Sequence, residues 1–124
     1  FDQSAIVTGH GMGTSGFVYV PKTCAAGASC RVHVVLHGCK QNATDIGQDY
    51  VKNTGYNRWA DTNHIVVLYP QTGKGAVNSC RDWWGYDDAN YAKKSAPQMK
   101  AIVGMIDQLA KGTSPAAATN SKRP

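Results

Sequence analysis

The sequence predicts an α/β fold, with a mixed and mostly parallel sheet flanked by helices. Two apolar runs rich in β-branched residues, 32–37 and 65–69, are typical of buried strands, and helical segments separate them. Because strands that alternate with helices pair in parallel, we expect these two to be parallel neighbours. Two earlier strands, 3–7 and 14–20, are joined by a short glycine-rich connection and are expected to form a hairpin.

The other elements follow from local patterns. Helices are expected over 44–51 and 56–63, and 71–91 is a long loop rich in Gly, Asn, Asp and aromatic residues, of a length that commonly carries function. A final helix is expected to begin at Ser95, with Gln98 completing a capping box, and to end at Gly112. Its apolar face is predicted from helical spacing to consist of Met99, Ile102, Val103, Ile106 and Leu109.

Composition excludes several classes of function. The chain has 124 residues, of which 42% are hydrophobic and 17% charged, as in a globular domain. No apolar run reaches the length needed to span a membrane, so no membrane association is expected. The net charge of +5 is scattered without a nucleic-acid-binding motif, so we expect no nucleic-acid partner. Phe1 is not an initiator methionine, and we expect a processed or cut N-terminus.

Four cysteines in a small chain indicate an oxidising, extracellular compartment. Three pairings are possible, and we favour Cys24–Cys30, across the end of a hairpin, together with Cys39–Cys80. C-x-x-C spacing does not occur, so no metal site is expected, and no cofactor is expected either. Asn42 begins a glycosylation sequon that matters only in a eukaryotic host.

The most informative segment is the turn His37-Gly38-Cys39, which follows the buried run 32–37. In α/β-hydrolases an H-G turn after the third strand supplies one backbone N–H of the oxyanion hole. The chain has no G-x-S-x-G nucleophile motif; the nearest string, 13–16, has the wrong spacing. The sequence therefore predicts part of an esterase without its nucleophile.

Four sequence strings, of which the first contains this turn, match the motifs of one protein family and occur in the same order. They are Leu36-His37-Gly38-Cys39, Asn53-Thr54-Gly55-Tyr56-Asn57-Arg58-Trp59-Ala60-Asp61, Val67-Leu68-Tyr69-Pro70-Gln71 and Cys80-Arg81-Asp82-Trp83-Trp84-Gly85. Over about residues 14–111 the chain resembles extracellular poly(3-hydroxybutyrate) (PHB) depolymerases. The resemblance is closest to the fungal-type single-domain enzymes, which resemble circular permutations of the usual hydrolase order, with the triad segment first.

The resemblance implies a secreted serine esterase that hydrolyses PHB or its oligomers by acyl-enzyme chemistry with a Ser-His-Asp triad. Nothing in this chain matches the triad segment, so activity of the chain alone is not expected. We expect residues 1–112 to form a partial α/β-hydrolase catalytic domain that is incomplete without a complementary triad-bearing chain or segment. Residues 113–124 have the composition of a flexible tail or linker.

The resemblance also implies roles for individual residues. Cys39 matches the position whose backbone N–H donates to the oxyanion; the alternative is a purely structural half-cystine. His37 and Gly38 are expected to shape the turn rather than to act as a base. Trp83 matches a position lining the substrate crevice, with Trp84 and Tyr86 following it, although ordinary core packing is the alternative. Arg81 departs from relatives that often carry Trp there.

The remaining candidates are given structural roles. Asp61 is expected to cap or pair locally, and Asp82 to order its loop. No motif accompanies His10, His33 or His64. Packing between helix and sheet is expected for Tyr56, Asn57 and Trp59.

Two other functions remain open. One is a non-catalytic module that binds polyester through the aromatic side chains of the 83–86 segment. The other is a related secreted esterase of the feruloyl or acetylxylan type, since these families share the H-G-C turn.

Overall fold

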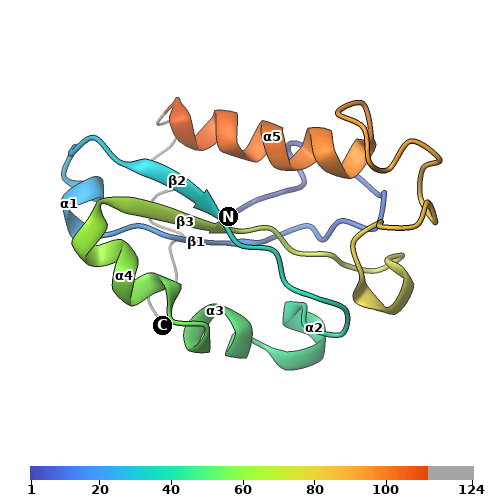
Figure 1. Cartoon of the computed structure of the whole chain (residues 1–124), viewed down its shortest axis with the longest axis horizontal. Helices are drawn as coiled ribbons and strands as arrows, with labels where there is room; N and C mark the ends of the chain where they lie inside the picture. The colour runs from blue at the N-terminus through green and yellow to red at the C-terminus, as the bar shows by residue number, and fades with distance from the viewer. Residues whose placement is uncertain (112–124) are drawn as a thin grey trace.

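A computed structural model describes residues 1–111 and shows a small mixed sheet between two helical layers (Figure 1). Its strands are β1 (Phe17–Tyr19), β2 (Arg31–Val34) and β3 (Ile65–Tyr69), in the spatial order β1-β3-β2. β2 pairs in parallel with β3, as predicted, with Val32 opposite Val66. β1 pairs with β3 in the antiparallel sense, so the three described strands contain one pairing of each kind and are not mostly parallel.

The predicted strand over 3–7 and its hairpin are wrong. The segment forms turns, and only an isolated bridge joins Asp2 to Ser15. The buried Gln3 side chain takes over the role of a strand: its amide donates to Gly13 O at 2.7 Å and Gln71 O at 3.0 Å, and its Oε1 accepts from Gln71 N at 2.8 Å. A side chain satisfies these backbone groups, so the segment needs no sheet ladder.

Three short helices cover one face of the sheet: α2 (Ala43–Ile46), α3 (Asp49–Asn53) and α4 (Tyr56–Asn63). The single helix expected over 44–51 is therefore divided in two, because Gly47 lies between them at a φ of 61° that ends α2. The helix expected over 56–63 is present as α4.

α1 (Lys22–Ala25) lies in the connection from β1 to β2, and the Cys24–Cys30 disulfide holds it there with Cα atoms 5.9 Å apart. The pairing is the one that we favoured. It joins a short helix to the segment before β2 instead of closing a hairpin end.

α5 (Pro97–Ala110) covers the opposite face (Figure 1). The expected capping box is absent, because the N-cap is Ala96 and no side chain caps the helix. Gln98 instead uses its side chain on other segments: Oε1 accepts from Asp82 N at 2.9 Å and Nε2 donates to His10 O at 2.8 Å. Pro97 occupies the first turn, where its missing N–H costs nothing.

The apolar face predicted for α5 is correct at Ile106 and Leu109, which pack against the core, but it is rotated from the real one at the other positions. Gln98, Ala101 and Met105 are its buried residues, whereas Met99 and Val103 are exposed. Gln98 explains the rotation. Its hydrogen bonds hold its side chain toward the interior, and Ala101 and Met105, three and seven residues later, lie on the same face of the helix.

Two hydrophobic clusters lie on the two faces of the sheet, as strand alternation requires. The cluster under α5 contains Phe1, Met12, Val18, Val20, Leu68, Ala101 and Met105. The cluster under α3 and α4 contains Tyr19, Val35, Val51, Ala60, Val67 and Tyr69.

α4 is tied to the sheet by two hydrogen bonds. Tyr69 OH donates to Asn57 Oδ1 and Tyr19 OH donates to Asp61 Oδ2, each at 2.7 Å. Asp61 therefore makes a long-range contact instead of the local one expected. Asn57 is buried as predicted, but Trp59 is 67% exposed, so packing against the sheet was the wrong expectation for Trp59.

Residues 112–124, including Gly112 and the expected tail, lie outside the described residues. None of the helices within residues 1–111 is long and apolar enough to cross a membrane.

Candidate functional site

The loops that follow β2 and β3 meet at the carboxyl ends of these two parallel strands, where α/β sheets commonly bind ligands. The Cys39–Cys80 disulfide joins the loops and brings the two Cα atoms to 4.1 Å. This is the second pairing that we favoured. It places the His37-Gly38-Cys39 turn beside the loop that carries Trp83, Trp84 and Tyr86.

His37 is buried and uses both ring nitrogens. Nε2 accepts from Thr72 N at 3.2 Å, so the proton of the neutral ring is on Nδ1, which lies 2.7 Å from Gly38 O. Burial lowers the pKa of His37 below its ordinary value of 6.5. The Thr72 hydroxyl donates to Ser79 O at 2.8 Å, so it is not activated by the imidazole. This geometry suits a structural support and leaves no free nitrogen for a general base.

The backbone amide of Cys39 lies between two amides that are already used. Gly38 N–H donates to Gln41 Oε1 at 2.7 Å, and Lys40 N–H donates to Asn78 O at 3.0 Å. Within residues 1–111, Cys39 N–H has no acceptor, and the residue is exposed. An exposed amide fixed between two bonded neighbours can donate to a ligand oxygen.

Asn42 is buried beneath the same loop, with 3% of its surface exposed. Its Oδ1 caps α2 by accepting from Asp45 N at 3.0 Å, and its Nδ2 donates to Thr72 Oγ1 at 3.2 Å. A glycan attached to Nδ2 does not fit this buried, hydrogen-bonded conformation.

Asp82 organises the aromatic loop. Its Oδ1 accepts from Gly85 N at 2.5 Å and Tyr86 N at 3.0 Å, and its Oδ2 from Asp87 N at 3.1 Å and Asp88 N at 2.9 Å. Desolvation raises the pKa of this carboxyl, but the four backbone donors outweigh it and the pKa is lowered. Its contacts are those of a loop-ordering residue.

The three aromatic side chains of this loop form a continuous ladder. Trp83 meets Trp84 edge-on with ring centroids 5.0 Å apart, and Trp84 meets Tyr86 at 4.9 Å. Tyr86 is anchored by donating from its hydroxyl to Cys80 O at 2.6 Å. Trp83 is 66% exposed, so in this structure its ring is a surface group rather than part of a core.

Arg81 points inward, away from this surface. Its Nη2 donates to Pro70 O, Nη1 lies 3.9 Å from Met12 Sδ, and its buried Nε has no partner among residues 1–111. Burial lowers the pKa of the guanidinium to about 10. Arg81 is therefore an internal cation and not part of the exposed aromatic surface.

The sequence offered no signal for Gln41 or Thr72. Each uses its side chain to hold a backbone group of these loops, and an isolated polar residue in a loop has no periodicity that would reveal such a role.

No catalytic triad is assembled in residues 1–111. A His–Asp pair does exist, with His10 Nδ1 3.1 Å from Asp87 Oδ2, but no serine hydroxyl is hydrogen-bonded to a histidine in this part of the chain. The described residues also contain no group of three or more His, Cys, Asp or Glu side chains placed to hold a metal ion.

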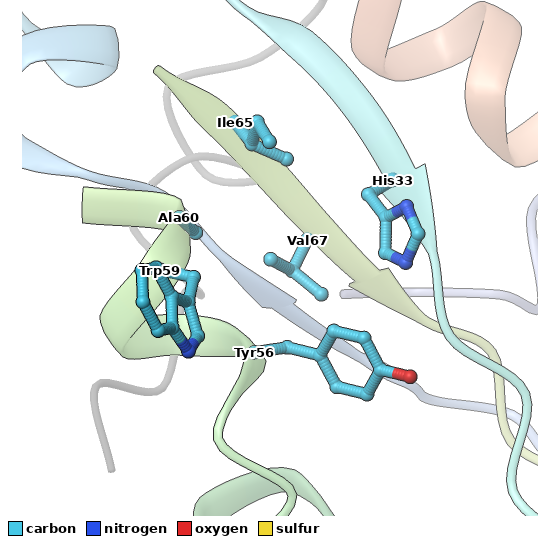
Figure 2. A pocket seen from close by; sticks show the side chains of 6 residues that line it. All are labelled: His33, Tyr56, Trp59, Ala60, Ile65 and Val67. Atoms are coloured by element: carbon cyan, nitrogen blue, oxygen red, sulfur yellow. The ribbon is translucent and has the colours of Figure 1, made fainter. Parts of the chain in front are cut away.

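A separate apolar groove of about 310 Å³ lies on the α4 face of the sheet (Figure 2). Its lining residues are His33, Tyr56, Trp59, Ala60, Ile65 and Val67. None of them belongs to the two loops described above.

The chain is similar to known polyester-degrading enzymes. It is 64% identical over 115 residues to a poly(3-hydroxybutyrate) depolymerase of Delftia acidovorans, covering 91% of this chain and 23% of that protein. It is 43% identical over 126 residues to a polyhydroxybutyrate depolymerase of Talaromyces funiculosus, covering 90% of this chain and 37% of that protein.

The fold matches as well. The crystal structure of PHB depolymerase from Penicillium funiculosum superposes with a TM-score of 0.83 at 41% identity, covering 92% of this chain and 40% of that one. A serine-to-alanine variant of PHB depolymerase complexed with an R3HB trimer gives a TM-score of 0.82, also at 41% identity, with the same coverage of 92% and 40%. The chain thus spans less than half the length of these relatives. Residues 14–113 match the Esterase PHB depolymerase family, and the chain belongs to that family.

Proposed function

We propose that this chain forms part of a secreted serine esterase that hydrolyses poly(3-hydroxybutyrate) or its oligomers through an acyl-enzyme. The triad-bearing segment of the fold, on the same or a second polypeptide, supplies the nucleophile, base and acid. This chain supplies the Cys39 backbone N–H to the oxyanion hole. Trp83, Trp84 and Tyr86 supply a wall of the substrate crevice.

The observation that carries the proposal is the unused amide of Cys39. Two hydrogen-bonded neighbours and the disulfide to Cys80 hold this amide in a fixed orientation, which is what stabilising a developing oxyanion requires. The same disulfide sets the aromatic ladder beside it. A flat apolar wall suits the methyl groups and ester planes of hydroxybutyrate units.

The similarity to depolymerases supports the polyester as substrate, and the two disulfides support an oxidising, extracellular location. The test combines the chain with the triad-bearing segment and compares initial rates on hydroxybutyrate oligomers and on feruloyl sugar esters. We expect faster release from the oligomers. A preference for the sugar ester would assign the chain to another esterase activity.

A polyester-binding module is the second candidate, and the exposure of Trp83 favours it. If the chain acts without a triad, it binds hydroxybutyrate polymer and releases no soluble acid. Sedimentation with polymer granules, together with titration of released acid in the presence of every native chain, distinguishes binding from hydrolysis.

A further inference from the structure

We propose that Gln41 is a positioning residue for the oxyanion donor. Its side-chain carbonyl holds the Gly38 amide and, through it, the orientation of the Cys39 N–H. The inference rests on the proposed function and adds to it a residue that acts through the backbone of the turn rather than by touching the substrate.

The turn between β2 and α2 needs more than the disulfide to fix its backbone (Figure 1). Two peptide groups meet at Gly38, and a glycine lets the peptide groups on either side of it rotate more freely than other residues do. The disulfide holds the side chain of Cys39 and leaves this rotation free. Each of the two peptide groups therefore needs a hydrogen bond of its own to hold its plane.

Both peptide groups have such a bond. The group that carries the Cys39 N–H is held through its carbonyl, because Gly38 O lies 2.7 Å from His37 Nδ1. The preceding group carries the Gly38 N–H, which donates to Gln41 Oε1 at 2.7 Å. This second bond resembles the half of a capping box in which a later side chain returns to an earlier backbone N–H. With both planes held, the Cys39 N–H keeps one direction.

Gln41 has a fixed base although its side chain is exposed. The next residue, Asn42, is 3% exposed and donates from Nδ2 to Thr72 Oγ1 at 3.2 Å. Ala43 N–H donates to Gln71 Oε1 at 2.8 Å. These two bonds tie the backbone that follows Gln41 to the loop after β3, so its Oε1 is presented to the turn from a rigid position.

Residue 38 is a glycine because Gln41 occupies the space of a side chain there. A Cβ on residue 38 would lie 2.9 Å from Gln41 Oε1 and 3.6 Å from Gln41 Cδ, and apart from chain neighbours no other atom of residues 1–111 comes within 4 Å of it. The φ of Gly38 is not in the left-handed region that favours glycine. Gly38→Ala should therefore push the Gln41 side chain away and break its hydrogen bond.

The first experiment measures kcat and KM of the assembled enzyme on hydroxybutyrate oligomers. Gln41→Met keeps the length of the side chain and removes its acceptor. We expect kcat to fall about tenfold with KM unchanged, which is less than the roughly 10²- to 10³-fold fall for complete loss of one oxyanion donor. Gln48→Met, the same change at a glutamine whose side chain does not cap α3, is the matched control and should leave kcat unchanged. A rise in KM at constant kcat would assign Gln41 to substrate binding and overturn the proposal.

Gly38→Ala tests whether the glycine and the glutamine act as one unit. Alone, it should lower kcat by the same factor as Gln41→Met, and the double variant should lose no more than either single variant. Losses that multiply would show that the two residues act independently and would overturn the proposal.

A readout that does not depend on turnover separates this proposal from the proposed function. With ¹⁵N-cysteine incorporated in this chain alone, the Cys39 amide of the assembled enzyme should have an order parameter of about 0.85, falling below about 0.6 in Gln41→Met. Cys80 N–H, which donates to Val77 O at 2.9 Å, is the internal control and should stay rigid in both. A Cys39 amide that stays rigid in Gln41→Met overturns the positioning role. An amide that loosens without any fall in kcat supports the positioning role and contradicts the oxyanion function.

Discussion

Cys39 and Cys80 lie 41 positions apart in the sequence, and their disulfide holds their Cα atoms 4.1 Å apart. This bond joins the turn that carries the unused amide to the loop that carries the aromatic ladder. This one covalent link therefore sets the distance between the amide proposed to stabilise the transition state and the aromatic side chains proposed to contact the substrate.

Removing this link should lower both stability and activity. In the loop-entropy relation, a bridge across 41 residues stabilises by about 4 kcal/mol, and one across 6 residues by about 2 kcal/mol. Cys39→Ala with Cys80→Ala should therefore reduce the free energy of unfolding about twice as much as Cys24→Ala with Cys30→Ala. Urea titration measures both. Only the first pair should lower kcat in the assembled enzyme, and equal kcat for the two double variants would argue against a positioning role for the bond.

His37 should make stability depend on pH below neutrality. Its pKa is lowered in the folded chain, so the unfolded chain binds more protons once the pH falls below about 6.5. The stabilisation is complete above that pH and declines as the pH falls towards the folded-state pKa. Thermal melts from pH 8 to pH 5 should show a smaller decline for His37→Gln than for the parent, with exposed His64→Gln as the control. Parallel curves for the parent and His37→Gln would contradict the neutral, buried assignment.

Asp82→Ala removes the acceptor of four backbone N–H groups and should loosen the 82–88 loop. We expect Tm to fall by roughly 5 °C, since hydrogen bonds to a charged acceptor are among the stronger ones. Polyester binding should weaken as well, because Trp83 loses its fixed position. Asp87→Ala, at a carboxylate paired with an exposed histidine, is the matched control and should change binding little. Full polymer binding by Asp82→Ala would show that loop order is not required.

Trp83→Ala should weaken binding of the chain to hydroxybutyrate polymer about tenfold, because a buried aromatic contact contributes on the order of 1.5 kcal/mol or more. Trp59→Ala provides a close control, since Trp59 is 67% exposed and Trp83 66% exposed, but on different surfaces. Quantitative adsorption to polymer films measures both. If the two variants lose affinity equally, general hydrophobicity accounts for the binding and the crevice assignment fails.

The sequence was sufficient to predict those elements in which hydrophobic pattern and residue propensity agree. The β-branched run at 65–69 became β3, the segment 56–63 became α4, and the alternation of strand and helix gave the parallel pairing of β2 with β3. Both disulfides have the favoured pairing: the short separation of Cys24 and Cys30 suggested the first, and the second joins the two cysteines that remained.

Side-chain hydrogen bonds that replace backbone patterns could not be predicted. Gln3 ties its segment to Gln71 without a ladder, although 3–7 has strand-like composition. Gln98 fits a capping box in sequence, yet it binds the loop at Asp82 and sets the rotation of α5. In both cases a tertiary contact of one amide overrides the local preference of several residues.

The most direct measurement is kcat for the assembled enzyme in which the amide linking Gly38 to Cys39 is replaced by an ester, made by chemical synthesis and ligation. The replacement removes the N–H of residue 39 and keeps the disulfide, and it also weakens Gly38 O as the acceptor of the His37 Nδ1–H bond. We expect kcat on hydroxybutyrate oligomers to fall by about 10²- to 10³-fold with little change in KM, as for loss of one oxyanion donor. The same replacement at exposed Lys74 should have no effect. An unchanged kcat with the ester at residue 39 would contradict the oxyanion role of this chain.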